Sequence, residues 1–384
     1  MVNTPLYQDY IQAPIFIGAA ANKITGVVKA LRDNNAKAYL ISLPVLGKSI
    51  NTIYAKSVIF RSRSGIQFFL PVFSNRYMRI IYGLICFGWF CLYKVKSNDR
   101  IIFYNHSIEY ILGLIILCAK KNKPFLDIED APHSVERGWR WLISPFLFKI
   151  FYTLSRKKKF IISHELAAAL NMSEYCVVYG AINNNLHELL ALEIDHIEPL
   201  VIHYGGSLGK DTGIYEFCDA VIELYKLLPK DVCKINFVVT GYGERDEILS
   251  LQSKILLGGL QVDYYENMPQ NEYFNLLKKC HIGLSLRAPE SKLAKNTFPS
   301  KVVEITANGL LLISTMTSDI PRLFDNNSAI LIKDLSADSL VESILWCLKN
   351  RNSLIKIAKN GQNIARKNFN SIYVGKEILN FISD

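Results

Sequence analysis

The sequence lacks cysteine pairs of the kind that hold a metal ion or form a redox site. Its eight cysteines are scattered along the chain, and none belongs to a CxxC pair. Scattered cysteines among apolar residues are typical of reduced thiols in a hydrophobic core. The pattern excludes a disulfide framework and indicates a cytoplasmic protein without a cysteine metal site.

Long apolar segments and a secretion signal are lacking as well. Residues 1–10 are polar and carry no charged segment followed by an apolar one, so we expect no secretion. The longest apolar run, Ile80–Tyr93, is too short to span a bilayer comfortably and predicts a buried helix. A second run, residues 108–119, is shorter and contains Glu109. We therefore predict no integral membrane segment.

The common signatures of dinucleotide and nucleic-acid binding are also missing. No GxGxxG follows the first predicted strand, at residues 14–17. A second predicted strand, at residues 200–204, leads into a predicted glycine-rich loop at 205–213, which lacks the GKS or GKT of a Walker A loop. A net charge of +10 and a pI near 9.0 predict attraction to anionic partners. Because no zinc-finger spacing or aromatic RNA-binding signature accompanies this charge, we expect no nucleic-acid partner.

What the sequence does contain is an alternation of strands and helices that begins twice. A chain of 384 residues is long enough for two ordinary domains. The alternation predicts an α/β protein with two Rossmann-like domains, whose parallel sheets face a central cleft. We place an acceptor-binding domain at residues 1–183 and a nucleotide-sugar-binding domain at 199–365. A helix at 366–384 is expected to pack back towards the N-terminal domain.

Polar residues follow two successive predicted strands in the first half. One strand is followed by His106, and the next by Glu129, Asp130 and His133. The carboxyl ends of parallel strands meet at one edge of a sheet, so these side chains predict a catalytic or acceptor-binding group. Helix capping and loop hydrogen bonds are the alternative interpretation for His106 and for the cluster after it.

An aromatic, apolar segment at 139–154 ends in the basic run 156–159. It predicts either an interfacial helix on anionic lipid headgroups or a core helix with a solvated basic end. The first alternative would bring the chain into peripheral contact with an anionic membrane.

The most informative stretch is residues 296–309. Pro299 suits the first turn of a helix, where its missing N–H costs nothing. Gly309 is suited to end this helix and to lead into a short apolar strand. We therefore expect a helix over about residues 300–307.

The start of this predicted helix carries groups that suit a nucleotide. Ser300, the free backbone N–H groups and Lys301 favour an anion such as a phosphate. Glu304, one turn further on, offers a carboxylate that can accept two ribose hydroxyls. An amphipathic helix with a solvated Lys and Glu explains this stretch, taken alone, equally well.

In their order and spacing, the motifs of the second half resemble a GT-B glycosyltransferase, most similar to the retaining family 4 (glycosyl transferases group 1). The segments that carry the resemblance are Tyr204–Leu208 with Gly213 and Ile214, Val239–Gly243, Asn267–Pro269, Pro299–Glu304 and Ala307–Gly309. The resemblance implies transfer of a sugar from a UDP- or GDP-sugar, with retention of configuration and without a cofactor or bound metal. By analogy, the acceptor is a saccharide on a lipid carrier in bacterial surface polysaccharide synthesis, of O-antigen or capsule type.

The resemblance also implies roles for individual residues. Glu304 would hold the ribose, and Gly241 with Tyr242 would line the base pocket. The residues expected to bind the donor are Glu304, Ser300, Lys301, Gly206, Ser207, Lys210, Arg287, Gly241, Tyr242, Asn296 and Pro299. Asp130 is the first candidate for contact with the acceptor, and the other candidates are His133, Glu129 and His106.

Two positions depart from the family pattern. Asn296 stands where the family has the first of two acids, and Ser207 and Thr212 stand where the loop often has Arg and Lys. A diphosphate leaving group still needs a counter-charge. We assign that charge, as a hypothesis, to three residues: Lys210, Arg287 and Lys301.

Two other functions fit the same architecture. A nucleotide-sugar 2-epimerase would act on the donor alone, without an acceptor. A non-catalytic nucleotide-sugar-binding protein would explain the missing acid and cationic pair as lost chemistry.

Overall fold

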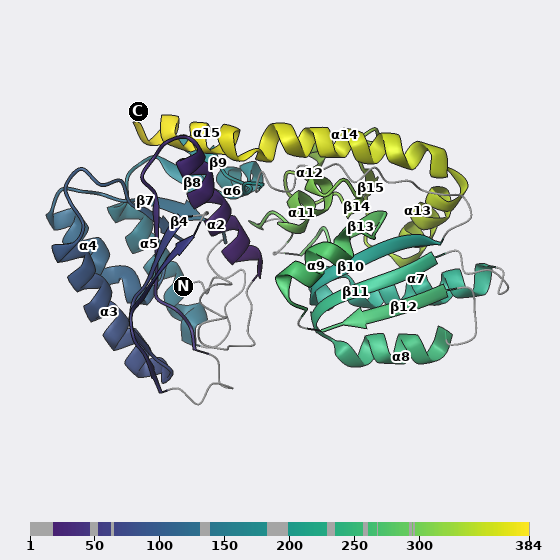
Figure 1. The fold of residues 1–384 in the computed structure, drawn as a ribbon, viewed down its shortest axis with the longest axis horizontal. Coiled ribbons are helices and arrows are strands. Elements are labelled where there is room, and N and C mark those ends of the chain that lie inside the picture. Colours follow the sequence, from purple (N-terminus) through teal and green to yellow (C-terminus); the bar gives the residue numbers. More distant parts are fainter. Residues whose placement is uncertain are drawn as a thin grey trace. The chain divides into compact units, whose positions relative to one another are not determined.

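In a computed structural model the chain forms two compact units (Figure 1). Unit 1 comprises Met1–Asn183 with Asn370–Asp384, and unit 2 comprises Asn184–Phe369. The structure describes residues 18–46, 53–62, 65–130, 139–182, 199–228, 235–255, 260–266, 268–291, 294 and 296–383. The predicted strand at 14–17 lies outside these residues. The functional domain limits predicted at 183, 199 and 365 stay predictions.

Unit 1 contains a four-stranded parallel sheet in the order β6-β7-β8-β9. Its strands are β6 (Ile102–Tyr104), β7 (Phe125–Ile128), β8 (Lys159–Ile161) and β9 (Tyr175–Val177). The other strands are β1 (Tyr39–Ser42), β2 (Tyr54–Ala55), β3 (Val58–Ser62), β4 (Gly65–Phe69) and β5 (Val72–Phe73). β1 pairs with β4 in parallel, whereas β3 pairs with β4, and β2 with β5, in antiparallel fashion. Unit 1 therefore contains antiparallel pairs besides the expected parallel ones. The connection between β3 and β4, for example, is too short to hold the crossover helix that a parallel pair requires.

The helices of unit 1 include the last helix of the chain. They are α2 (Gly18–Asp33), α3 (Arg76–Tyr93), the 3₁₀ turn η1 (Ile108–Tyr110), α4 (Ile111–Ala119), α5 (Trp139–Leu154), α6 (His164–Ala169) and α15 (Ser371–Ser383). The Ser371 hydroxyl donates to Asp33 of α2 over 2.8 Å. Val374 of α15 joins the core around Phe125 and Phe160. The end of the chain is therefore part of the unit 1 core.

The apolar helix α3 is buried on one side only. Asn75 caps it by accepting hydrogen bonds from the N–H groups of Tyr77 and Met78. Ile85 and Trp89 are 56% and 54% exposed. The prediction of a buried helix is therefore wrong, because a run that is apolar on every side does not reveal which side finds a partner. In the part of the chain that the structure describes, no helix combines the length and apolar character that a bilayer crossing requires.

Unit 2 is built on a six-stranded sheet, all parallel, in the order β12-β11-β10-β13-β14-β15. The strands are β10 (Leu200–Leu208), β11 (Ile235–Gly243), β12 (Leu260–Tyr265), β13 (Ile282–Ser285), β14 (Leu311–Thr315) and β15 (Ile330–Ile332). The helices are α7 (Ile214–Leu227), α8 (Arg245–Ile255), α9 (Gln270–Leu277), α11 (Lys301–Ala307), α12 (Ile320–Leu323), α13 (Ala337–Lys349) and α14 (Arg351–Phe369), with the 3₁₀ turn η3 (Lys210–Thr212). The chain starts this doubly wound sheet at β10 and continues to one side with β11, then to the other with β13. The point of reversal, between β10 and β13, is where such sheets bind ligands.

The glycine-rich segment after Tyr204 is partly strand rather than loop. β10 continues to Leu208 and pairs in parallel with β11, so that Gly206 lies opposite Gly241. A Cβ atom on Gly241 would lie 1.9 Å from the carbonyl oxygen of Gly206, so only glycine allows this approach. The expectation of a strand that ends at Tyr204 is corrected accordingly.

Candidate active site

A cluster of charged and polar groups in unit 2 lies at the carboxyl ends of β10 and β13. These strands are neighbours in the sheet although more than one strand separates them in sequence. Gly206 belongs to the end of β10, Arg287 follows β13, and Lys301 begins α11 on the way to β14. The cluster therefore occupies the point of reversal of the sheet.

Lys301 lies directly against the backbone of Gly206. Gly206 has a φ of +104°, and a Cβ atom there would be 2.4 Å from the Lys301 Nζ. The same ammonium lies 5.8 Å from the centre of the Tyr204 ring. Gly206 is thus required both for its backbone conformation and for the space that the lysine occupies.

Two cations share this position. Burial, and then the nearby Arg287, lower the pKa of Lys301 to about 8, although Glu304 acts in the opposite direction. Among the described residues, no hydrogen-bond or ion-pair partner of the Lys301 ammonium is found. The backbone N–H of Arg287 donates to Thr315 Oγ1 over 3.0 Å, and its guanidinium donates to Thr297 Oγ1. A fixed arginine beside a partly desolvated lysine is an arrangement that an anion stabilises.

Glu304 is held one turn further along α11. The Tyr273 hydroxyl, from α9, donates to Glu304 Oε2 over 3.2 Å. Burial, and then the charge of Glu304, raise the pKa of Tyr273 well above its ordinary value, so the phenol remains a donor. The carboxylate is consequently oriented by a neutral group, and it can accept hydroxyl hydrogen bonds from a ligand.

A neutral histidine supports this arrangement from β10. His203 is buried, and its Nε2 lies 2.8 Å from Thr240 Oγ1. Burial, and then the nearby Lys301, lower its pKa to about 3. Its ring packs against Tyr273 with 5.7 Å between ring centres. His203 therefore adds no charge to the cluster and fixes the position of Tyr273.

The remaining donor-site candidates lie around this cluster. Ser207 and Lys210 are exposed, and their side chains have no hydrogen-bond partner among the described residues. Tyr242 is 54% exposed at the end of β11, next to Gly241. Pro299 is buried, whereas Asn296 and Ser300 are half-buried, and Ser300 makes no capping hydrogen bond with its side chain. The structure brings together Gly206, Arg287, Lys301 and Glu304, and the other assignments stay predictions.

Unit 1 has a second polar cluster, centred on Glu129 at the end of β7. Glu129 is buried, forms an ion pair with Lys23 of α2, and accepts from the Tyr104 hydroxyl over 3.3 Å. Burial is the main cause that raises the pKa of Glu129; the charge of Lys23 opposes the rise, and Asp127 and Asp130 add to it. Its carboxylate already has two partners within the protein, which makes it a supporting group of the cluster.

The other unit 1 candidates are arranged differently. Asp130 is half-buried and accepts from the Asn105 side chain over 3.2 Å. His106 is turned to α5, where its Nε2 lies 2.9 Å from Ser144 Oγ, and burial lowers its pKa to about 4. His133 lies outside the described residues. Asp130 and Glu129 are thus adjacent, and His106 is a neutral residue packed on a helix.

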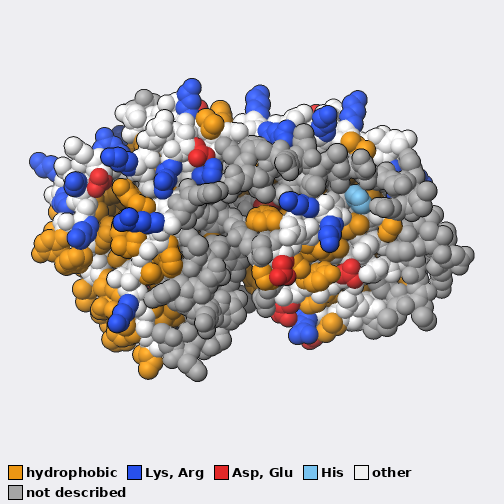
Figure 2. Space-filling view, in the orientation of Figure 1, with side chains coloured by type: hydrophobic (Ala, Val, Ile, Leu, Met, Phe, Trp, Pro, Cys, Tyr) orange, Lys and Arg blue, Asp and Glu red, His pale blue; other side chains and the backbone are white. Residues whose placement is uncertain are grey.

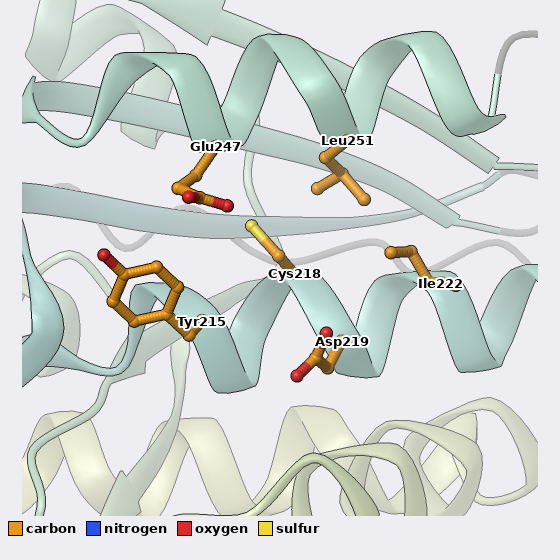
Figure 3. A pocket seen from close by; sticks show the side chains of 6 residues that line it. All are labelled: Tyr215, Cys218, Asp219, Ile222, Glu247 and Leu251. Carbon is orange, nitrogen blue, oxygen red and sulfur yellow. The ribbon is translucent and has the colours of Figure 1, made fainter.

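A shallow pocket elsewhere in unit 2 contains none of these residues. Figure 3 shows side chains of α7 and α8 that point toward one another around it. It is lined by Tyr215, Cys218, Asp219, Ile222, Glu247 and Leu251. No group of His, Cys, Asp or Glu suited to hold a metal ion is found in the described ranges of the chain.

Sequence patterns could not have identified several members of the clusters. Tyr273 precedes Glu304 by 31 residues and belongs to a different helix. Lys23 and Glu129 are 106 residues apart in sequence. Contacts over such separations depend on how the sheet is wound, and no local spacing encodes them.

Comparison with protein families finds a match within unit 2. A family model described as "Glycosyl transferases group 1" matches residues 200–364, which is somewhat less than half of the chain and most of unit 2. A search of curated protein sequences gave no match.

Solved structures extend the similarity to most of the chain. Sucrose-phosphate synthase from Thermosynechococcus elongatus has a TM-score of 0.65 and 12% identity, over 94% of this chain and 91% of that chain. A glycosyltransferase from Rickettsia africae has a TM-score of 0.63 and 14% identity, over 95% of this chain and 94% of that chain. Anabaena Alr3699/HepE, solved with UDP-glucose, has a TM-score of 0.55 and 17% identity, over 73% of this chain and 78% of that chain. The fold is therefore that of GT-B proteins, and this prediction is confirmed.

Proposed function

We propose that this chain, a glycosyltransferase by its GT-B fold and its glycosyl transferases group 1 domain, moves a sugar from a UDP- or GDP-sugar to a saccharide with retention of configuration. The observation that carries the proposal is the Lys301–Arg287 pair at the point of reversal of the unit 2 sheet. Breaking the bond between the sugar and the diphosphate places negative charge on the diphosphate. Two preorganised cations stabilise that charge and make the nucleotide a better leaving group.

The nucleoside end of the donor is assigned to Glu304. Its carboxylate lies one turn beyond Lys301, and Tyr273 orients it through a 3.2 Å hydrogen bond. A nucleoside diphosphate with its diphosphate at Lys301 would present its ribose hydroxyls to this carboxylate. Gly241 and Tyr242 would then contact the base. The Anabaena protein was solved with UDP and with UDP-glucose, which favours UDP-sugars over GDP-sugars as the first donors to test.

The acceptor is assigned to unit 1. Asp130 is the first candidate to contact it, because Glu129 is engaged by Lys23. We propose a lipid-linked saccharide acceptor in bacterial surface polysaccharide synthesis, of O-antigen or capsule type, at the inner face of the cytoplasmic membrane. Family resemblance and the basic charge of the chain support this choice. The transferred group would be a hexose or an N-acetylhexosamine.

The proposal is tested in two steps with the full chain. Nucleotide sugars are first screened for thermal stabilisation, since a ligand that binds the folded state raises the unfolding temperature by mass action. The stabilising donor is then incubated with a bacterial lipid extract, and the anomeric configuration of the product is read by NMR. Failure of every UDP- and GDP-sugar to stabilise the chain would contradict the donor assignment. Conversion of the donor without an acceptor would instead indicate an epimerase.

Controls distinguish the site from general charge effects. Lys301→Met should abolish donor stabilisation, whereas Lys226→Met, at an exposed lysine of α7, should leave it unchanged. We also propose that no metal ion takes part. Transfer rates measured with and without EDTA should therefore agree, and a loss of activity that added Mg²⁺ restores would contradict this.

A further inference from the structure

The helix α3 carries an exposed hydrophobic stripe that the proposed function does not use. Its members recur every fourth residue, which places them along one side of the helix. They are 54–70% exposed and are Tyr77, Ile81, Ile85, Trp89 and Tyr93. Leu112 and Ile115 of α4 are exposed as well, at 38% and 51%. These seven residues are called the α3–α4 surface.

This surface is not an unfinished contact between α3 and α4. α3 packs against α4 so closely that a Cβ on Gly88 would lie 2.7 Å from Leu112. A Cβ on Gly113 of α4 would lie 2.5 Å from the Phe87 ring. Because Leu112 is exposed and also lies against α3, the exposed apolar residues of the two helices adjoin one another. Large exposed apolar faces of this kind mark sites of interaction with a partner or a membrane.

Most of the exposed charges next to α3 and α4 are positive. Neither α3 nor α4 contains an acidic residue. Arg76 and Lys94 are exposed at the two ends of α3, and Lys121 is exposed just after α4. Figure 2 shows hydrophobic side chains gathered on the side of unit 1 where α3 and α4 lie, with Lys and Arg side chains among them. An apolar face with a cationic rim is complementary to an anionic lipid surface.

A tryptophan and a lysine form an anchor at one end of the surface. The Lys94 ammonium lies 5.7 Å from the centre of the Trp89 ring. Tryptophan favours the boundary between lipid headgroups and acyl chains, and lysine reaches from there to the phosphates. A second copy of the chain would fit less well, because a symmetric contact through this surface would bring its cationic rims together.

The basic run after α5 is a poorer candidate for lipid contact. Lys159 is buried, and its ammonium donates to the carbonyl oxygen of Arg156. Arg156 itself donates to the carbonyl oxygen of Lys123 over 2.9 Å, and Lys158 lies over the Phe381 ring. Most of this run is thus engaged within unit 1, and the cationic rim of the α3–α4 surface is better placed for lipid contact.

We infer that the α3–α4 surface binds the headgroup layer of an anionic membrane, with the apolar stripe entering the layer and the cationic rim contacting lipid phosphates. The inference identifies the surface behind the membrane contact of the proposed function, and it rests on that function only for its biological purpose. It requires neither donor binding nor transfer, so the two can fail separately.

Vesicle flotation of the full chain tests the inference. The probes are vesicles of phosphatidylcholine alone and of phosphatidylcholine with phosphatidylglycerol in equal parts. The triple variant Ile81→Ser, Ile85→Ser, Trp89→Ser should lower partitioning onto the anionic vesicles by about tenfold or more, since it removes three apolar contacts. Lys94→Glu should also weaken it, and raising the salt concentration should do the same. The matched control is Trp346→Ser with Ile355→Ser, which replaces two exposed apolar residues of unit 2.

Far-UV circular dichroism and thermal unfolding of the same samples report whether unit 1, which carries the three substitutions, is folded. Lost vesicle binding by a triple variant that keeps the wild-type spectrum and unfolding transition supports the inference. Thermal stabilisation by UDP reports separately on the donor site of unit 2. Equal vesicle binding by the wild type, the triple variant and the control would overturn it, as would absence of wild-type binding to anionic vesicles. A dimer in gel filtration that only the triple variant loses, without vesicle binding, would overturn it in favour of a second copy. Failure of UDP to stabilise the wild type would count against the donor site alone.

Discussion

Replacing Lys301 with methionine removes a cation that burial disfavours and keeps a side chain of similar length. The pKa of Lys301 falls from 10.5 to about 8 in the folded chain, chiefly because of burial and Arg287. Keeping this lysine protonated in the folded chain at neutral pH therefore lowers the free energy of unfolding by about 3 kcal/mol. Lys301→Met should therefore stabilise the ligand-free protein, although it removes the group that binds the donor diphosphate.

The sign of the pH effect follows from the same pKa. Between pH 8 and 10.5 the unfolded chain binds a proton at Lys301 that the folded chain has lost. The free energy of unfolding of the wild type should therefore gain a contribution as the pH rises through this window, and that contribution is absent below pH 8.

Thermal unfolding at several pH values measures both effects. At pH 7 the variant should unfold at least about 4 °C above the wild type, and the difference should shrink as the pH approaches 10. The matched control, Lys226→Met, should follow the wild type. A variant that unfolds below the wild type at pH 7, or a difference that does not depend on pH, would refute the description of Lys301 as a desolvated cation.

Five further substitutions test the supporting contacts. Glu304→Gln should raise the donor KM by about tenfold with a smaller change in kcat, because it weakens charge-assisted hydrogen bonds to the ribose. Tyr273→Phe should raise the donor KM in the same way but by less. Steady-state kinetics measure both constants, and an unchanged KM would contradict both predictions. Gly206→Ala should lower donor affinity by about a hundredfold, since the alanine Cβ would overlap the Lys301 Nζ and the φ of this position is +104°. Calorimetry measures the affinity, and a wild-type value would contradict the close approach of Lys301 to Gly206. Lys23→Met should lower the free energy of unfolding by about 3 kcal/mol, because Glu129 loses its ion-pair partner. Adding Glu129→Gln to this variant should restore part of the lost stability. Urea unfolding measures both changes, and equal stability of all three proteins would contradict the ion pair.

Local sequence signals predicted the position of helix α11 well, but they did not predict the contacts that support its Glu304. Pro299 and Gly309 bracket α11 closely, because proline and glycine impose backbone constraints that are readable from the sequence alone. Tyr273 gave no signal, since its contact with Glu304 exists only once the sheet is wound.

The two corrections have physical causes that the sequence does not display. The glycines after Tyr204 predicted a loop, and instead they allow β10 and β11 to approach closely as strands. The apolar residues of α3 predicted burial, yet hydrophobicity alone does not tell a core helix from one with an exposed apolar side.

Calorimetric titration of UDP and of GDP into the full chain, across a range of pH, measures whether Lys301 and Arg287 hold the donor diphosphate. At least one of the two nucleotides should bind, and its affinity should weaken as the pH rises above about 8, where the free Lys301 loses its proton. Lys301→Arg, whose side chain stays protonated throughout, should bind without this weakening. Affinity that is independent of pH in the wild type, or that persists when both cations are replaced by methionine, would show that Lys301 and Arg287 do not hold the diphosphate.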